Sequence, residues 1–258
     1  MVMKNRYLFR LFLLIIISFP LITIKAQNVA PGKNFSPYWE IGVNGGTSLF
    51  FGDIKEKYFF PVSKDNNEWR LGGGLITGYQ FTPVFGLRGQ MLYGQLAGTK
   101  RSLNRYFEGD YLEFNLNTTI NLNNLFGKKR SNRFASTYLL VGVGITNYNS
   151  TFYTLSTGTK IGYIGFGSGS GIKGRTLEGI LTGGVGVNFR VNDHFIVNFE
   201  TANRIMNSDE MDGWVKNFKY DVYNYTSLGL TYRFGRRKAK PGPKIPVLHH
   251  NIQEVPPG

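Results

Sequence analysis

Residues 110–122 read DYLEFNLNTTINL, and polar and apolar side chains alternate along them. Successive side chains of an extended strand point to opposite faces, so the period of two predicts a β-strand. One face carries Leu112, Phe114, Leu116, Thr118, Ile120 and Leu122. The other carries Glu113, Asn115, Asn117, Thr119 and Asn121. The predicted sheet therefore has one apolar face and one thoroughly polar face.

The same period recurs along the chain, and no convincing amphipathic helix follows the N-terminal segment. The predicted strands are 38–51, 69–81, 85–96, 110–122, 135–147, 176–190, 194–206 and 222–234. A chain with 33 glycines and 15% aromatic residues suits many strands whose backbones approach closely. The composition therefore favours an all-β fold in one domain.

Alternation alone fits both a soluble sandwich and a membrane barrel, because the apolar face meets a core in one and lipid in the other. Strand length favours the barrel, since these strands are about twice the usual five or six residues and can cross a bilayer at a tilt. The connections between the strands also alternate in length. The long ones are 52–68, 97–109, 148–175 and 207–221, and the short ones are 82–84 and 191–193. The exception is a longer basic turn at 123–134, which lies on the short-turn side. Sheet edges cannot stay unpaired in hydrocarbon. The sequence thus predicts an eight-stranded antiparallel transmembrane β-barrel, an up-and-down meander with long extracellular loops.

The N-terminal segment has the features of a secretory signal peptide. Lys4, Arg6 and Arg10 precede an apolar run over 11–24, and Ala26 supplies the small residue of a cleavage site. A membrane anchor is the alternative, but a spanning helix needs roughly 20 apolar residues. The predicted organisation is a signal peptide at 1–26, a periplasmic lead at 27–37, an outer-membrane barrel at 38–235 and a basic, proline-rich periplasmic tail at 236–258.

The formal charge of +14 is typical of a nucleic-acid-binding protein, but export to the outer membrane argues against that partner. Part of the positive charge leaves with the signal peptide, and part clusters in the tail. The chain has no cysteine, which excludes disulfides, zinc–thiolate clusters and thiol nucleophiles.

Side chains about fill the interior of an eight-stranded barrel, so no wide channel is expected. The alternation points these charged side chains into the lumen: Glu40, Arg70, Arg88, Glu113, Glu178, Arg190, Glu200, Arg204 and Arg233. Topology places both signs in the periplasmic layer and in the outer layer. We expect ion-pair networks that plug the barrel, because partnered buried charges are tolerated where isolated ones are costly. A narrow ion path through the lumen is the rival interpretation.

Catalytic and metal sites find little support in the sequence. Serine–histidine chemistry needs a histidine beside a serine, but His194 begins a strand at a periplasmic turn and 249–250 lie in the tail. Asp209, Glu210 and Asp212 carry carboxylates of the kind that holds calcium, but an acidic surface loop is the commoner explanation, and no metal site is predicted. The Gly/Ser-rich segment 156–175 lacks the strand–helix context of a phosphate loop and is expected to be a flexible extracellular loop. We therefore predict no enzyme and no cofactor.

The last predicted strand contains SLGLTYRFG at 227–235. Its pattern Ser227-x-Gly229-x-x-Tyr232-x-Phe234 resembles the C-terminal strand of bacterial outer-membrane barrels, which the barrel-insertion machinery reads. The alternation turns Tyr232 and Phe234 toward lipid at the interface, where amphipathic rings are well placed. The resemblance implies outer-membrane lipid and the insertion machinery as partners.

Three further stretches resemble the outer-membrane barrels of Bacteroidetes-type bacteria, and especially the PorG-like barrels linked to type IX secretion. The first stretch runs from Gly42-x-x-Gly45-x-x-Ser48 to Gly52-Asp53-Ile54. The second is Tyr153-Thr154-Leu155 with Gly158-Thr159, and it is followed by Lys160 and Ile161, where the family has other residues. The third is Glu200-x-x-x-Arg204 with Ser208-Asp209 and Asp212. The resemblance implies a component of, or an anchor for, secretion machinery.

Two classes of function therefore compete. A structural or interaction barrel predicts protein partners and no conductance, whereas a small pore or transporter for ions or small solutes predicts the reverse. The tail at 236–258 carries five basic residues and five prolines. Such a segment cannot bury a core, and we expect it to contact a periplasmic partner or an anionic surface. An unstructured remnant is the alternative for the tail.

Overall fold

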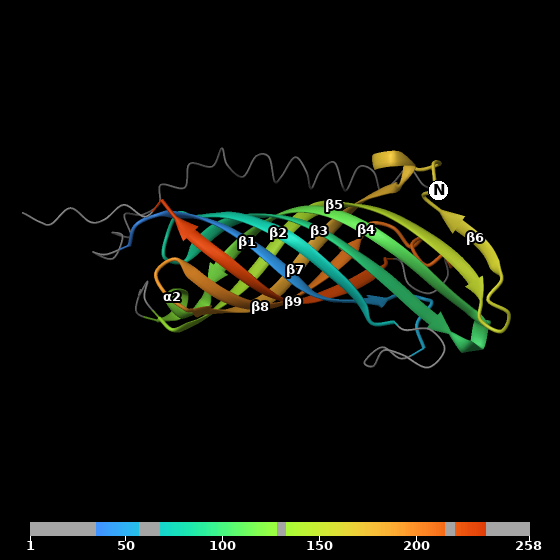
Figure 1. The fold of residues 1–258 in the computed structure, drawn as a ribbon, viewed down its shortest axis with the longest axis horizontal. Coiled ribbons are helices and arrows are strands. Elements are labelled where there is room, and N and C mark those ends of the chain that lie inside the picture. Colours follow the sequence, from blue (N-terminus) through green and yellow to red (C-terminus); the bar gives the residue numbers. More distant parts are fainter. Residues whose placement is uncertain (1–34, 57–67, 128–132, 215–219, 236–258) are drawn as a thin grey trace, which may run out of the picture.

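The computed structural model describes residues 35–56, 68–127, 133–214 and 220–235, which form a barrel made almost wholly of strands (Figure 1). Eight strands form the wall: β1 (Tyr38–Phe51), β2 (Arg70–Gln80), β3 (Phe85–Lys100), β4 (Arg105–Asn121), β5 (Ala135–Thr154), β7 (Thr176–Arg190), β8 (Phe195–Met206) and β9 (Val222–Phe234). A short strand, β6 (Lys160–Ile164), pairs with the outer end of β5. The short helical elements are η2 (Arg101–Leu103), α2 (Leu122–Phe126) and η3 (Ile172–Gly174). No helix within the described ranges is both long and apolar enough to span a membrane.

The wall closes on itself because the first strand pairs with the last. Around the wall the order is β1, β2, β3, β4, β5, β7, β8 and β9, and each strand is antiparallel to both neighbours. Along the β1–β9 seam, Trp39 pairs with Phe234 at one end and Phe51 with Val222 at the other. The predicted eight-stranded antiparallel meander is confirmed, and β1, β7 and β9 have the predicted bounds.

Three strands reach further than predicted at the long-loop end. The expected long connection at 97–109 is wrong, because β3 runs to Lys100 and β4 starts at Arg105, leaving η2 and one residue between them. That residue is Asn104, whose φ of 52° lies in the left-handed region that tight turns use. β5 also continues to Thr154.

The extra length of β3 was hidden because both of its faces are covered there. All four residues from Leu96 to Thr99 are buried. The segment after β1 packs over this strand so closely that a Cβ on Gly98 would lie 2.2 Å from the Ile54 carbonyl oxygen. Lys100 Nζ donates to the Lys55 carbonyl oxygen at 2.9 Å. With no face turned to lipid or water, the period of two disappears from the sequence.

The connection between β5 and β7 is more ordered than expected for a flexible loop. β6 pairs with β5 through Ser150 and Ile164, and the backbone N–H of Ile172 donates to Asn147 Oδ1 at 3.0 Å. Several of its glycines, Gly165 among them, have positive φ. Much of 156–175 is therefore folded against β5.

Side-chain hydrogen bonds hold the connections at the short-turn end. Thr82 Oγ1 accepts from the backbone N–H of Phe85 at 2.8 Å in the β2–β3 turn. In the β7–β8 turn, Asn192 Oδ1 accepts from the N–H groups of His194 and Phe195, both at 2.8 Å. The longer connection between β4 and β5 begins with α2, which Asn121 caps by accepting from the Asn124 N–H at 2.9 Å.

The outer wall of the barrel exposes apolar side chains on every strand. Large apolar residues exposed on it include Ile41, Val43, Leu75, Leu87, Met91, Leu116, Val141, Ile145, Val185, Phe199, Leu228 and Leu230. Toward the short-turn end many of the exposed residues are aromatic: Trp39, Phe81, Phe85, Phe189, Phe195, Tyr232 and Phe234. A soluble domain does not expose a continuous apolar surface of this extent, whereas a membrane barrel needs this band and aromatic girdle.

One patch of the outer wall is polar, on β8 and β9. Thr201 and Thr226 share a hydroxyl hydrogen bond of 2.8 Å, and Asn224 Nδ2 donates to Asn203 Oδ1 at 2.8 Å. Thr226 Oγ1 also donates to Asn224 Oδ1 at 2.8 Å. These side chains bond one another, which reduces the cost of facing lipid.

Candidate functional site

A buried ion pair crosses the middle of the lumen between β3 and β8. Arg88 Nη1 lies 2.6 Å from Glu200 Oε2, and Nη2 donates to Oε1 at 2.8 Å, so the contact is bidentate. Tyr138 on β5 donates its hydroxyl to Glu200 Oε2 at 2.6 Å. Both charged side chains are less than 5% exposed. Such a pair is tolerated only when its remaining hydrogen-bonding groups are largely satisfied, which the tyrosine helps to achieve.

A second buried pair lies one layer further toward the long-loop end. Arg204 on β8 donates from Nε to Glu113 Oε1 on β4 at 3.2 Å, and both side chains are fully buried. The Tyr223 hydroxyl donates to Glu113 Oε2 at 2.7 Å. Arg204 Nη1 also donates to the Ala202 carbonyl oxygen at 2.8 Å, and Asn115 Nδ2 donates to Glu113. Three strands, β4, β8 and β9, thus supply one connected polar cluster.

The outer half of the lumen is filled by an apolar, tyrosine-rich core. Its fully buried members are Phe50, Ile54, Leu92, Leu96, Phe107, Tyr111, Tyr148, Met206, Met211 and Tyr223, with Tyr225 and Ile180 nearly so. Ile54 and Met211 come from the connections after β1 and β8, so these two connections contribute to the filling. Ser48 and Tyr111 share a hydroxyl hydrogen bond of 2.8 Å within it.

The remaining inward charges of the outer layer, Arg70 and Glu178, do not pair with another member of the predicted set. Arg70 Nη2 lies 2.5 Å from Glu108 Oε1, and both side chains are partly exposed. Glu108 was missed because the sequence placed it in a long loop, whereas it belongs to β4. Among the residues that the structure describes, none forms an ion pair with Glu178.

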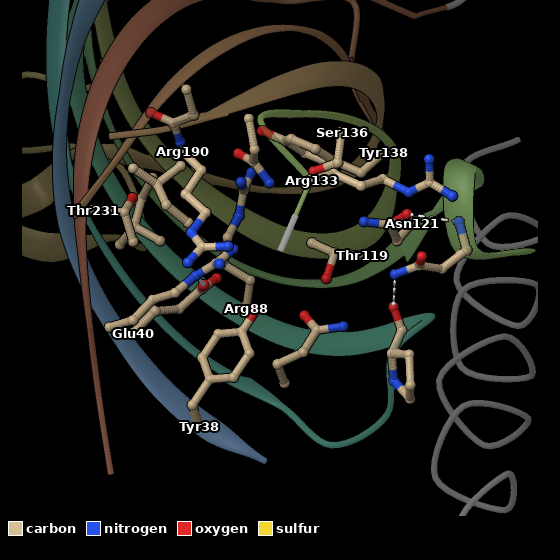
Figure 2. A pocket seen from close by; sticks show the side chains of 18 of the residues that line it. Tyr38, Glu40, Arg88, Thr119, Asn121, Arg133, Ser136, Tyr138, Arg190 and Thr231 are labelled. Carbon is tan, nitrogen blue, oxygen red and sulfur yellow. Dashed lines mark hydrogen bonds and ion pairs between the residues drawn. The ribbon is translucent and has the colours of Figure 1, made fainter. Parts of the chain in front are cut away.

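The short-turn end of the lumen opens into a polar cavity of about 80 Å³, which we call the vestibule (Figure 2). Its charged lining residues are Glu40, Arg88, Arg133, Arg190 and Arg233. Arg233 Nε lies 3.9 Å from Glu40 Oε2, at the limit of an ion pair. Arg190 pairs instead with Asp193 in the β7–β8 turn, a partner outside the predicted set.

Tyrosine hydroxyls are the functional groups that sequence reasoning missed most clearly. Tyr138 and Tyr223 each donate to a buried glutamate, and both stand at positions that the alternation turns inward. The sequence signal for these contacts was a tyrosine at an inward position on one strand and an acidic residue at an inward position on another strand. Lys55 and Glu68, which pair at 2.8 Å in full burial, gave no such signal because they lie outside any strand.

Four aspartates gather above the core, and we call them the acidic cap: Asp53, Asp209, Asp212 and Asp221. Burial, followed by the neighbouring carboxylates, raises the pKa of Asp209 to about 6, of Asp212 to about 7 and of Asp221 to about 8. Asp221 Oδ2 accepts from the Met211 N–H at 2.9 Å. Within the described ranges, no group of three or more acidic or histidine side chains has the arrangement that holds a metal ion, so the alternative of a calcium site at Asp209, Glu210 and Asp212 gains no support.

The histidine within the described ranges lies far from the outer rim. His194 stands in the β7–β8 turn, where Nδ1 is 3.1 Å from the Arg233 carbonyl oxygen and the ring stacks on Tyr232. Residues 249–250, the predicted tail and the predicted signal peptide lie outside the described residues. In β9, Ser227 faces inward, and Gly229 sits where a Cβ would lie 2.1 Å from Asn198 Oδ1. Tyr232 and Phe234 face outward.

No protein-family model matches the sequence, and a search of curated proteins gives no significant match. Solved structures of similar fold include Ail of Yersinia pestis, at 18% identity over 78% of this chain and 100% of that one, with a TM-score of 0.44. Neisserial surface protein A is similar at 11% identity over 76% and 97% of the two chains, with a TM-score of 0.44. The outer membrane enzyme PagL is similar at 11% identity over 74% and 97%, with a TM-score of 0.35.

The location follows from the wall itself. A closed sheet satisfies all backbone groups within a bilayer, and its outer face offers lipid an apolar band with an aromatic girdle at one end. The chain is an outer-membrane β-barrel. The β2–β3 and β7–β8 turns and both ends of the barrel segment lie on one side, whereas three of the four connections on the other side are long. The side with the short turns is the periplasmic side in barrels of this kind.

Proposed function

We propose that this barrel is a non-enzymatic structural or interaction protein that serves as a component of, or an anchor for, type IX secretion machinery. The main observation in favour of a structural or interaction role is that the lumen is filled. Two buried ion pairs occupy its middle, and a tyrosine-rich core occupies its outer half. A lumen filled by its own side chains leaves the loops, the rims and the wall as the working surfaces.

The secretion role is supported by a contact between two stretches that resemble the PorG-like family. The Ile54 N–H, from Gly52-Asp53-Ile54, donates to Asp212 Oδ2 at 2.8 Å, and Asp212 belongs to the stretch after β8. Residues that resemble one family at two distant sequence positions therefore form one structural unit at the outer end. Such a unit is a candidate docking site for a machinery protein.

The absence of enzymatic activity is proposed from the position of His194. Its ring is occupied with the Arg233 carbonyl and Tyr232 at the periplasmic turn, away from the outer rim where lipid or peptide substrates are met. A serine nucleophile needs a histidine within hydrogen-bonding reach.

A small pore or transporter is the alternative, and the vestibule is the observation that favours it. Its polar lining continues inward to Arg88 and the Arg88–Glu200 pair. Recordings from purified protein in planar bilayers separate the two functions. We expect no steady conductance; reproducible unitary currents would favour the pore instead.

Cross-linking in intact cells tests the interaction role. A photoreactive residue at Phe166, exposed on the outer loop, is compared with one at Phe126, exposed at the opposite end. We expect type IX secretion proteins among the captured partners. Capture of only the insertion machinery at both positions would contradict the secretion role and leave the barrel fold untouched.

The basic tail is proposed to contact a periplasmic protein. Its five basic residues and five prolines follow directly on the barrel segment. Deleting 236–258 is expected to remove a co-purifying periplasmic protein without changing insertion of the barrel. An unchanged set of co-purifying proteins would count against the contact.

A further inference from the structure

The vestibule has a strongly positive lining that the closed-barrel function does not use. Four arginines line it against one acid, Glu40. In Figure 2, Arg88, Arg190 and Glu40 reach into the cavity, while Arg133 and Asn121 lie on its other side. Positive charge in a partly enclosed, low-dielectric cavity attracts anions and repels cations.

Two of these arginines are weakly neutralised. Arg233 is 3.9 Å from Glu40, too far for a hydrogen bond. Arg190 pairs with Asp193, whose side chain is 66% exposed on the turn, so solvent screens that pair strongly. Arg88, by contrast, is matched by Glu200 deeper in the lumen. Of these three arginines, Arg190 and Arg233 therefore leave the most charge available to a ligand.

The walls also present buried polar atoms that lack protein partners. Arg88 Nε, Arg233 Nε and Asn198 Oδ1 have no hydrogen-bond partner among the described residues, and Arg88 and Asn198 are more than nine-tenths buried. All three side chains line the vestibule. The two guanidinium Nε–H groups are donors, which are normally satisfied when buried, and a ligand that brings acceptor oxygens satisfies them. Asn198 Oδ1 is an acceptor and gains no hydrogen bond from such oxygens.

We propose that the vestibule binds an oxyanion, a carboxylate or a phosphate group, that enters from the periplasm and is held by Arg190 and Arg233. Guanidinium groups match the oxygens of both anions in bidentate fashion. The cavity of about 80 Å³ is several times the roughly 10–15 Å³ that one water needs, so it accepts one such group. Entry from the other side is blocked, because the ion pairs and the core fill the lumen above it.

The inference concerns a ligand of the periplasmic end and does not depend on the secretion role. It is tested by calorimetric titration of the full-length, detergent-solubilised barrel with inorganic phosphate, with succinate and with a short acidic peptide. Phosphate or succinate binding alone identifies a free small anion as the ligand. Stronger binding of the peptide identifies an acidic segment of a protein.

Variants that lose a positive charge and a variant that loses a negative charge distinguish an effect on anion binding from an effect on folding. Arg190→Gln and Arg233→Gln are each expected to weaken binding on the order of tenfold, because each removes a charged hydrogen bond. Glu40→Gln removes the acid from the lining and is expected to strengthen binding several-fold, which structural damage does not do. Arg175→Gln makes the same charge change at the outer end and serves as the control.

Two outcomes overturn the proposal. One is the lack of any saturable binding of all three probes by the wild-type barrel at millimolar concentration. The other is equal affinity in the wild type, Arg190→Gln, Arg233→Gln and Glu40→Gln proteins. Heat-modifiable migration of each variant in gel electrophoresis verifies that the barrel is closed in every sample.

Discussion

The backbone N–H of Ile54 donates to Asp212 Oδ2 at 2.8 Å, and this bond joins the connection after β1 to the connection after β8. Asp212 Oδ1 accepts in turn from the Trp214 N–H at 2.9 Å. Ile54 and Met211 are both fully buried in the core below. The carboxyl group of Asp212 thus helps to hold two outer connections over the lumen.

The acidic cap is expected to loosen as the pH rises. Burial raises the pKa of Asp209 to about 6 and of Asp221 to about 8, above the ordinary value near 3.9. A raised pKa in the folded state stabilises the fold below the unfolded value, and that stabilisation is lost as the pH passes through the folded value. In a Trp39→Phe, Trp69→Phe background, we expect the fluorescence of Trp214 to shift to longer wavelength between pH 6 and pH 9, a window on the order of those pKa values.

The control for the acidic cap replaces Asp209 and Asp221, the two aspartates whose pKa values define the pH window, with neutral asparagines. Asp209→Asn with Asp221→Asn is expected to keep the short-wavelength emission of Trp214 throughout that range. The same shift in this variant would show that the carboxyl groups are not responsible.

Breaking the Arg88–Glu200 pair is expected to be costly. Glu200→Gln leaves a guanidinium buried without its counter-charge, which typically costs about 3–5 kcal/mol in the free energy of unfolding. The double change Arg88→Met with Glu200→Leu is expected to recover most of that loss, because it removes both charges. Urea unfolding in lipid vesicles measures the difference.

A matched exposed pair calibrates that experiment. Arg175 pairs with Asp110 at the outer end, where both side chains are partly exposed. Arg175→Gln is expected to cost at most about 1 kcal/mol. If the buried and exposed changes cost the same, the lumen pair is not the desolvated contact described above.

Neighbouring glycines in β1 provide a test of the seam. A Cβ on Gly46 would lie 2.0 Å from the Thr226 carbonyl oxygen of β9, whereas the nearest atom to a Cβ on Gly45 is 3.9 Å away. Gly46→Ala is therefore expected to destabilise the barrel by about 1–3 kcal/mol or more through overpacking. Gly45→Ala should be close to neutral. Melting temperatures of the two variants in the same detergent compare them, and equal values would contradict the close approach.

The aromatic residues at the end of β9 are expected to matter for insertion. Tyr232→Gln with Phe234→Gln removes two outward rings from the interface and should lower the fraction of barrel inserted by the machinery. Tyr163→Gln with Phe166→Gln removes two exposed rings from the outer loop and is the matched control. Insertion into vesicles that contain the machinery measures both; equal loss would assign the effect to general hydrophobicity.

The alternation of polar and apolar residues predicted the wall strands because successive side chains of each strand face lipid and lumen in turn. Residues 222–234 expose Leu228 and Leu230 to lipid and turn Ser227 inward, so their pattern alone fixed the strand. Where a second layer covers the strand, as at Ala97 and Gly98, the rule no longer applies and the sequence suggested a loop.

Which charges meet inside the lumen lay beyond sequence reasoning. Alternation turns Arg88 and Glu200 inward, but their pairing across the barrel depends on strand tilt and on the stagger of neighbouring strands. Arg70 meets Glu108 for the same reason, on a stretch of β4 that was assigned to a loop. The acidic cap depends on the packing of two outer connections, which no periodic pattern encodes.

The seam between β1 and β9 has a consequence for the order of assembly. Trp39 in the first strand pairs with Phe234 in the last strand, so these two residues are separated by nearly all of the barrel sequence. The barrel therefore cannot close until its last strand has been synthesised and exported. Before that moment two rows of amide groups lack neighbours, and exposed strand edges of this kind are prone to self-association. Closure of the barrel is therefore post-translational.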